Sequence, residues 1–561
     1  MRGRLTRLLN TIRYLRAEQL YGQARRYAVA TKDRRLSGES DRAPDFPGCR
    51  WTLAKDILPP ATEGIQENAI SKGIFRFLNT SREIGLPPRW DADNQPKLWL
   101  YNLHYFDWLW VLDFNAGKRV VLDWIGKCRP CSSCVGWDPY PTSLRLINWC
   151  GFFFGRFKDD TESDRGFCNA LWESLYRQCG WLSRHVETHL LGNHYLENAA
   201  ALAFVGACFQ GEHARKWLNR GIRILSGEIR EQILPDGVHF ELSPMYHCRI
   251  LYVLAVLMEA EVEELTALLA EPAHRMARAL DELRHPDGKI VLLSDSAHGV
   301  YHDPECLLTY CARHLPGPGI ESAPSGGFNL PASGYYGWRG SDGTYLIADF
   351  GRIGPDYIPG HGHADIFNFE LSLNGHRVVT DSGVHDYETS ATRRYCRSTA
   401  AHNTVEIDGQ DQCELWGAFR VARRGYPRDV TWRCDERGFA LSGWHDGYRR
   451  LPGKPTHARQ MQWSTAEGLT VHDRIAARRP VQCISRLHLH PACHVADVSS
   501  RLVHVSYPGG DFAVETNCDV RVEETPYFER FYEVRTRPCL CMIGRGCEVE
   551  IRYRIRSKTT P

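Results

Sequence analysis

The spacing of apolar residues changes once along the chain. From about residue 65 to 315, apolar residues recur at helical spacing in segments separated by short polar breaks. After about residue 325, apolar and polar residues alternate in short runs bounded by Gly, Asn and Asp. Representative helical segments are 193–209, 211–234 and 246–271, and representative strands are 343–351, 402–410, 438–447 and 468–475. The pattern predicts a helical part followed by an antiparallel all-β part.

A segment rich in Pro, Gly and Ser, HLPGPGIESAPSGGF (314–328), separates the two parts. The chain has 561 residues, which exceeds what one hydrophobic core usually supports. We therefore expect three regions: 1–60 with an N-terminal helix and linker, 61–320 with helices, and 321–561 with strands.

The first thirty residues predict a basic amphipathic helix. Leu5, Leu8, Leu9, Ile12 and Leu15 recur at helical spacing with arginines between them. The segment lacks the uninterrupted apolar run of a signal peptide, and no run elsewhere is long enough to span a bilayer. Docking onto the body of the protein and lying on an anionic membrane surface are both open for such a helix. We expect a cytoplasmic protein, with peripheral membrane association as an alternative.

Composition excludes some classes of protein. A net charge of +2 argues against a dedicated nucleic-acid binder. The 20 cysteines are scattered, which favours reduced thiols over a disulfide framework. Cys128, Cys131 and Cys134 have the spacing that opens an iron–sulfur site, but a fourth ligand at suitable spacing is missing, so we discount this motif.

The segment PGHGHADIFNFELSLNGHRVVTDSG (359–383) places His361, His363 and Asp365 just before a predicted hairpin. Asn374-Gly375 supplies the two residues with positive φ that a type I′ turn needs. Pairing from that turn sets Leu373 opposite His376 and Asn368 opposite Asp381. The returning strand therefore carries Asp381 toward the histidines.

A metal site is one interpretation of this region. His363, Asp381 and His402 form a mixed nitrogen and oxygen set that Zn²⁺ accepts. The nearby Gly360 and Gly362 permit close backbone approach. Two histidines at alternate positions are a weak signal alone, because alternate residues of an exposed strand face the same way and many are simply solvated.

Two helical segments carry further candidate chemistry. Asn193, His194 and Glu197 lie near the start of a predicted helix, with the last two on one face, where they can bind or orient an anionic ligand. A lone histidine on a helix is more often structural. Glu241 and Tyr246 flank a loop that ends at a proline; the tyrosine is either a buried core phenol or a proton carrier.

A fourth segment, GWDPYPTSLRLINW (136–149), mixes aromatic residues with Arg145 and Asn148. It is either a sugar-binding wall, with Tyr140 as part of it, or the start of a packed helix.

Five segments taken together resemble the heparinase II/III-like polysaccharide lyases. They are GNHYLENAAAL, DGVHFELSPMYH, GHGHADIFNFEL, TDSGVHDY and STAAHNTVEIDG, within a resemblance that covers roughly residues 90–480. The resemblance implies an α+β multidomain fold, with an incomplete α/α toroid followed by an antiparallel β-sandwich. The overall pattern looks more like the branch found among bacterial exopolysaccharide, capsule and lipopolysaccharide biosynthesis genes.

The resemblance implies β-elimination at a uronic acid in a polysaccharide or oligosaccharide. Asn193 and His194 would neutralise the substrate carboxylate, supported by Glu197, and Tyr246 would be base, acid or both. His361 would be the second acid/base group or a carboxylate partner. His363, Asp381 and His402 would hold a structural Zn²⁺. Tyr140, Arg145, Asn148 and Glu241 are the expected substrate-binding residues, and Asp365 is expected beyond the first ligands or as a strand cap.

Two other functions remain open at this point. Hydrolysis of a glycosidic bond would need a carboxylate pair drawn from Glu197, Glu241 and Asp365. A non-catalytic glycan-binding protein of polysaccharide assembly would need none of these groups to react.

Overall fold

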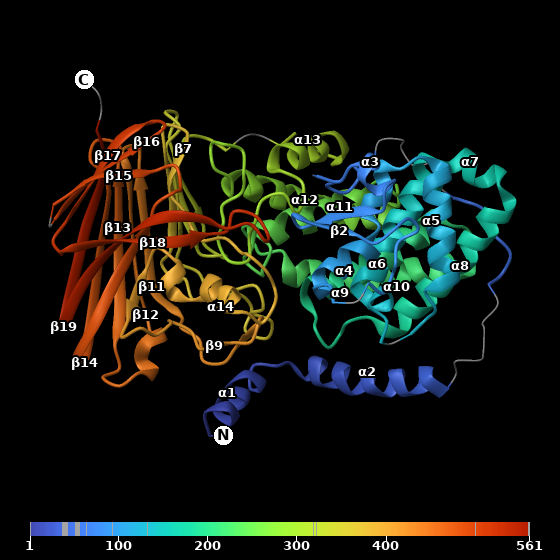
Figure 1. The fold of residues 1–561 in the computed structure, drawn as a ribbon, viewed down its shortest axis with the longest axis horizontal. Helices are drawn as coiled ribbons and strands as arrows, with labels where there is room; N and C mark the ends of the chain where they lie inside the picture. Colours follow the sequence, from blue (N-terminus) through green and yellow to red (C-terminus); the bar gives the residue numbers. More distant parts are fainter. Residues whose placement is uncertain are drawn as a thin grey trace.

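The protein, described by a computed structural model, consists of a helical part and a part made of β-sheets that lie side by side (Figure 1). The described residues are 2–35, 43–50, 57–62, 64–92, 94–131, 133–317, 319–320, 323–499 and 501–558. The helical part ends with α13 (Pro304–His314), and the main sheets begin with β3 (Gly326–Leu330). The predicted order, helices followed by antiparallel strands, is confirmed.

The helical part is built around two inner helices. Its helices are α3 (Glu67–Ile70), α4 (Lys97–Tyr105), α5 (Phe114–Lys127), α6 (Pro139–Trp149), α7 (Lys158–Ser163), α8 (Arg165–His185), α9 (Gly192–Cys208), α10 (Glu212–Gln232), α11 (Pro244–Met258), α12 (Glu263–Glu282) and α13. A small hairpin, β1 (Ile74–Phe77) and β2 (Thr80–Glu83), packs beside α4. Every residue of α11 and nearly every residue of α9 is buried. The predicted segment 246–271 is therefore two helices, broken at residues 259–262.

The N-terminal segment forms two helices, so the predicted basic amphipathic helix is followed by a second one. They are α1 (Arg2–Ile12) and α2 (Ala17–Arg35), and both run along one side of the body (Figure 1). The Gln19 side chain at the start of α2 donates to the carbonyls of Leu190 and Tyr357, at 3.3 and 3.2 Å. The segment is thus docked onto both parts of the protein. Among the described residues, none of the helices is long and apolar enough to cross a membrane.

The β part contains two large antiparallel sheets and a separate two-stranded one, formed by β9 (Leu415–Trp416) and β10 (Arg420–Val421). The five-stranded sheet has the order β3, β4 (Tyr335–Arg339), β5 (Tyr345–Asp349), β6 (Phe369–Leu373) and β7 (His376–Val379). The main path of the larger sheet is β11 (Pro427–Asp435), β12 (Gly438–His445), β13 (Thr456–Ser464), β14 (Gly468–His488), β19 (Arg535–Lys558), β17 (Gly510–Thr516), β16 (Leu502–Tyr507) and β15 (His494–Val498). Off this path, β8 (Val405–Ile407) pairs with β14 and β18 (Val520–Tyr527) with β19.

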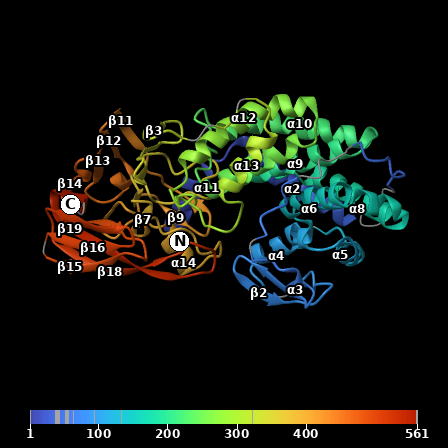
Figure 2. The same cartoon turned by 90° about the horizontal axis from the view of Figure 1, so that it is seen from above.

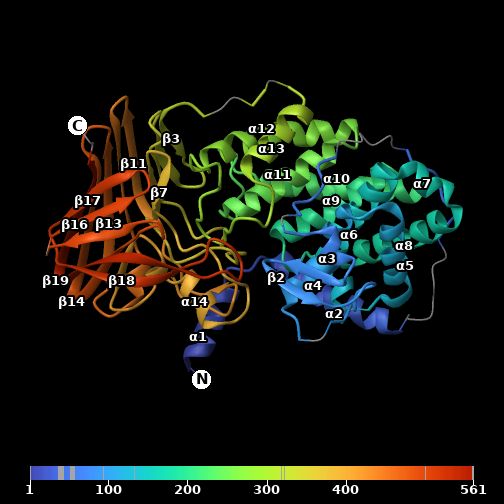
Figure 3. The ribbon, with the colours of Figure 1, turned by 45° about the horizontal axis from the view of Figure 1, so that its top comes forward.

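The smaller sheet lies between the larger sheet and the helical part (Figures 2 and 3). One of its faces packs on the larger sheet through residues such as Leu371 and Val471. Its other face packs on the end of the helical part, where Tyr335 and Tyr345 contact the cluster that contains Leu283. The loops that join the smaller sheet are therefore held directly against the helices.

The predicted hairpin begins in the predicted register and then shifts. Leu373 pairs with His376, but Leu371 pairs with Val379, so one extra residue is inserted in β7. Asn368 consequently does not pair with Asp381 in the ladder. The two side chains nevertheless meet, because the Asn368 amide donates to the Asp381 carboxylate beyond the end of the strands.

Candidate active site and metal group

The first turn of α9 presents Asn193 and His194 through an unusual backbone. Leu191 and Gly192 both have positive φ, 64° and 60°. A Cβ on Gly192 would lie 2.5 Å from Glu241 Oε1, so a larger residue there would displace that carboxylate. Instead, Glu241 accepts from the Asn193 backbone N–H and side-chain amide, each at 2.8 Å. The backbone N–H and the side-chain amide nitrogen of Asn193 thus both donate to the Glu241 carboxylate.

His194 is the exposed polar group of this turn. Its Nδ1 lies 3.1 Å from Glu187 Oε1, and its ring packs on Tyr140 with centroids 4.4 Å apart. Burial alone would lower the pKa of His194, but the Glu187 carboxylate outweighs it and raises that pKa. The side chain is 29% exposed, and Nε2 has no hydrogen-bond partner among the described residues. His194 can therefore carry a proton and donate it to an anionic group.

Glu197 stabilises the site through a buried ion pair. It is fully buried and makes a two-pronged ion pair with Arg249, at 2.6 and 3.0 Å. Because both of its oxygens face the guanidinium, Glu197 is not available to react with a sugar. Its role is to hold α9 against α11.

Two expected substrate-binding residues have structural partners instead. Arg145 is fully buried and donates to Gln178 Oε1 at 2.8 Å and to the Gly136 carbonyl at 2.7 Å. Asn148 is buried and donates to the Tyr105 carbonyl at 2.8 Å. The helix-start interpretation of segment 136–149 fits these contacts, and a substrate-binding role for Arg145 and Asn148 stays a prediction.

Tyr246 and His361 form the junction between the two parts of the protein. Tyr246 lies on the first turn of α11 and packs on the His361 ring, with centroids 3.9 Å apart. The Tyr387 hydroxyl donates to the Tyr246 hydroxyl at 3.3 Å. Burial raises the pKa of Tyr246 well above its usual value, and Tyr387 and Tyr301 raise it further. The phenol therefore keeps its proton at neutral pH and is suited to act as an acid.

His361 is held by carboxylates from the helical part. Its Nδ1 lies 2.9 Å from Asp295 Oδ2, so the pair fixes the orientation of the ring. Its Nε2 lies 3.4 Å from Glu241 Oε2, too far for a firm hydrogen bond. The side chain is 12% exposed. Nε2 is thus the ring nitrogen left to exchange a proton with a ligand.

Asp295 is the central residue that the sequence did not indicate. Its other oxygen, Oδ1, lies 2.8 Å from His363 Nε2. Arg393 donates to both oxygens, with 2.8 Å to Oδ2. Burial would raise the pKa of Asp295, but Arg393, His361 and His363 hold it well below its usual value. One buried carboxylate therefore joins His361 to His363. Its only signal in the sequence is a polar residue after the apolar run VLLS, which many loops share.

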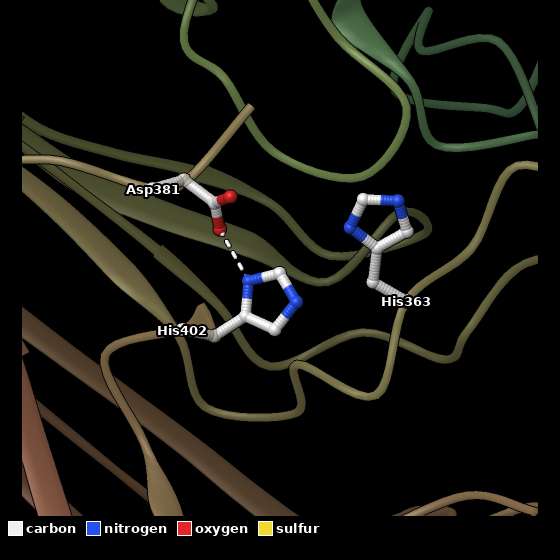
Figure 4. A group of neighbouring side chains, drawn as sticks. All are labelled: His363, Asp381 and His402. Atoms are coloured by element: carbon white, nitrogen blue, oxygen red, sulfur yellow. Dashed lines mark hydrogen bonds and ion pairs between the residues drawn. The ribbon is translucent and has the colours of Figure 1, made fainter. Parts of the chain in front are cut away.

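His363, Asp381 and His402 come together in a buried group (Figure 4). Candidate ligand atoms of the three side chains lie within 4.8 Å of one another, and this is the one such group of His, Cys, Asp and Glu found among the described residues. His402 Nδ1 lies 2.7 Å from Asp381 Oδ2. The discounted cysteine motif at 128–134 forms no group of this kind, and each of its cysteines is a free thiol.

The buried group fits a metal ion on independent grounds. His363 Nδ1 and His402 Nε2 are buried and have no hydrogen-bond partner among the described residues. Burial lowers the pKa of His363 to about 4, so its ring is neutral and offers a lone pair. Asp295 on the far nitrogen of His363 is the kind of partner that orients a ligating histidine. Two imidazoles and a carboxylate suit a divalent transition metal.

Asp365 and the two glycines lie close to the group in the sequence, and their surroundings differ. Asp365 is buried, and one of its oxygens has no partner among the described residues. Burial raises the pKa of Asp365 to about 6, and Asp381 also raises it. Gly362 is needed for close packing, since a Cβ there would lie 1.8 Å from the Ile353 carbonyl, whereas a Cβ on Gly360 would meet nothing nearer than 3.8 Å.

Comparison with known families matches both parts of this chain. The model described as "Heparinase II/III N-terminus" matches residues 118–303, and "Heparinase II/III-like, C-terminal" matches residues 322–553. The second match contains His361 and the complete metal group, and the first contains His194, Tyr246 and Asp295. The chain belongs to the heparinase II/III-like family.

Curated relatives and solved structures agree with this assignment. A heparin-sulfate lyase of Pedobacter heparinus is 26% identical over 302 residues, which are 49% of this chain and 44% of the relative. One of Bacteroides thetaiotaomicron is 28% identical over 276 residues, 42% of this chain and 39% of the relative. The matched segment thus spans less than half the length of either relative.

Solved structures extend the likeness of fold to nearly the whole chain. A crystal structure of heparinase III superposes with a TM-score of 0.73 at 19% identity, covering 91% of this chain and 87% of that one. Heparan sulfate lyase HepC from Pedobacter heparinus gives 0.62 at 19% identity, covering 96% and 89%. The toroid and sandwich fold class is confirmed.

Proposed function

We propose that the protein is a polysaccharide lyase that cleaves a uronic-acid-containing glycan by β-elimination. The observation that carries the proposal is the contact of Tyr246 with His361, 3.9 Å between ring centroids. The proton-binding His194 is linked to this pair through its neighbour Asn193, which donates to the Glu241 carboxylate near His361. Elimination needs an acid, a base and a group that neutralises the substrate carboxylate. These three side chains supply one of each. The family assignment supports the same chemistry.

The roles follow from the surroundings of each group. His194 Nε2 donates to the uronate carboxylate, which makes the C5 proton more acidic. His361 Nε2 takes that proton, with Asp295 on Nδ1 stabilising the charged ring that results. Electrons of the C5–H bond form the C4–C5 double bond as the bond from C4 to the glycosidic oxygen breaks. Tyr246 gives its proton to the departing oxygen, in keeping with its raised pKa.

Asn193 has a positioning role in this scheme. Its side-chain amide donates to Glu241, so it fixes the carboxylate that lies beside His361. Glu241 was expected to bind substrate, and its burial at 2% exposed favours the same positioning role.

Hydrolysis is disfavoured because the three candidate carboxylates are buried and two of them are paired with other side chains. Glu197, Glu241 and Asp365 are 0%, 2% and 3% exposed. Glu197 is committed to Arg249 and Glu241 to Asn193. A hydrolase needs two carboxyl groups that flank the bond to be cut, and none of these three flanks an exposed surface.

The metal that best fits the buried group is Zn²⁺, held by His363, Asp381 and His402. When bound, it would crosslink the loop at 359–365 to the ends of β7 and β8. This structural role requires no contact between the metal and substrate.

The substrate we favour is a bacterial cell-surface polysaccharide, such as an exopolysaccharide or capsule, because the sequence pattern resembles the biosynthetic branch of the family. The test is to incubate the protein with a panel of uronate glycans and to analyse the products. Elimination gives new ultraviolet absorbance and product ends lighter by one water than those of hydrolysis. Chain cleavage with saturated ends would overturn the proposal, and activity unchanged in Tyr246→Phe and His194→Ala would favour a non-catalytic role.

A further inference from the structure

Helix α1 is amphipathic, but its apolar face points to solvent. Leu5, Leu8, Leu9 and Ile12 recur at intervals of three and four residues and so form one stripe along the helix. These side chains are 59%, 41%, 59% and 42% exposed. A helix that simply packs on a protein turns its apolar stripe inward. Here the stripe faces away from the body.

The polar side of α1 faces the protein. Arg7 pairs with Glu414 at 3.3 Å, and Thr11 accepts from the Trp416 indole at 3.1 Å. Just after the helix, Arg424 stacks over the Tyr14 ring at 3.7 Å. These contacts fix the rotation of α1, so the outward direction of the leucines is imposed by the fold. A rotation that buried them would break all three contacts.

Helix α2 continues the same surface. Gln19 and Gly22 face the body, and a Cβ on Gly22 would lie 2.7 Å from the His189 backbone nitrogen. Leu20, Tyr21 and Tyr27 are 53%, 71% and 68% exposed. The two helices run along one side of the molecule (Figure 1), and both carry exposed leucine or tyrosine side chains.

The charge of this segment differs from that of the rest of the chain. Residues 2–35 contain ten Lys and Arg against two Asp and Glu, a net charge of +8. Since the whole chain carries +2, the remainder is net negative by six. Basic residues beside exposed leucines and interfacial tyrosines are the chemistry of a helix that lies on an anionic bilayer. A nucleic acid would use the charge but would leave the leucine stripe in water.

We propose that α1 and α2 form a docking surface for an anionic lipid membrane. α1 is 11 residues long, about 16 Å at 1.5 Å per residue, which is too short to cross a bilayer. It would therefore lie in the plane of the headgroups with its leucines below them. Its partner on the protein, the hairpin of β9 (Leu415–Trp416) and β10 (Arg420–Val421), carries Phe419, whose ring centroid is 6.2 Å from that of His361. Docking through α1 therefore sets the candidate active site close to the lipid surface.

The test uses the full-length chain and co-sedimentation with vesicles. Vesicles of phosphatidylcholine with phosphatidylglycerol should bind the protein, and vesicles of phosphatidylcholine alone should bind it much less. Binding should weaken as salt is raised. The double variant Leu5→Glu/Leu9→Glu should bind at least about tenfold less, because it removes two buried apolar contacts and adds two repelled charges.

A matched control makes the same change of charge elsewhere. Val498 and Val534 are exposed on the β part, at 43% and 61%, so Val498→Glu/Val534→Glu should keep membrane binding. Unchanged thermal unfolding would show that both double variants fold. The proposal fails if the wild type does not bind anionic vesicles, or if both double variants lose binding equally. It also fails if the leucines instead mediate self-association, seen by sedimentation velocity and abolished by Leu5→Glu/Leu9→Glu.

Discussion

Asp295 joins two groups of side chains that differ in exposure to solvent: an open end with His361 and a closed end with His363. At the open end, His361 and His194 keep part of their surface exposed, and Tyr246 packs on the His361 ring. At the closed end, His363, Asp381 and His402 are fully buried. The two histidine nitrogens that have no hydrogen-bond partner among the described residues are also buried. His361 and His363 are separated by a single glycine. Neighbouring histidines therefore acquire different chemistry from burial and partners, not from sequence position.

The largest effect we expect is at the open end. Tyr246→Phe removes the proton given to the departing oxygen, so kcat should fall by about 10²- to 10⁴-fold. The metal content and the thermal unfolding temperature should stay at wild-type values, because the closed end does not contact this hydroxyl. Steady-state kinetics beside metal analysis checks both statements. Loss of metal in Tyr246→Phe would contradict the separation of the two ends.

Asp295→Asn should damage both ends at once. The amide can no longer accept from both histidines and Arg393, so we expect kcat and metal affinity each to fall by about 10- to 100-fold. Asp287→Asn is the matched control, since Asp287 lies in the same connection as Asp295, pairs with Arg377 of β7 and touches neither end. An Asp295→Asn variant with normal metal affinity and reduced kcat would limit Asp295 to the open end.

Gly362→Ala tests the backbone that keeps the two histidines apart. Its Cβ would overlap the Ile353 carbonyl, so the free energy of unfolding should fall by about 1–3 kcal/mol, the usual cost of overpacking. Gly360→Ala has room for its methyl group and should change stability little. Urea unfolding of the two variants measures the difference. Equal stabilities would mean that the close approach at Gly362 is not required.

The smallest effect concerns the ion pair of His194 and Glu187. The folded protein raises the pKa of His194, so the folded state holds this proton more tightly than the unfolded chain. The stabilisation is complete below the unfolded value of about 6.5 and is lost as pH rises through the raised pKa. His194→Gln should therefore lower the unfolding temperature more at about pH 5.5 than at about pH 8.5. His376→Gln, at an exposed position, is the control. If His194→Gln lowered the unfolding temperature more at the higher pH, the predicted direction of the pH dependence would be wrong.

Local patterns in the sequence were sufficient to predict the helices and strands. They did not predict which side chains from distant segments contact one another. The helical and alternating periods predicted the order of the two parts, and Asn374-Gly375 predicted the turn of its hairpin. Arg145 looked like a sugar-binding residue because its buried partners, such as Gln178, lie 33 positions away. Asp295 was missed for the same reason, since it lies 66 positions from His361. The metal group was predicted from its residue types together with the family resemblance, and the ligand atoms lie within 4.8 Å of one another.

The metal content of two purified variants, His361→Ala and His363→Ala, decides whether these neighbouring histidines have separate roles. We assign His361 to proton transfer and His363 to the metal. His361→Ala should therefore keep the metal of the wild type and lose activity, whereas His363→Ala should lose the metal. Loss of metal in His361→Ala but not in His363→Ala would contradict the account.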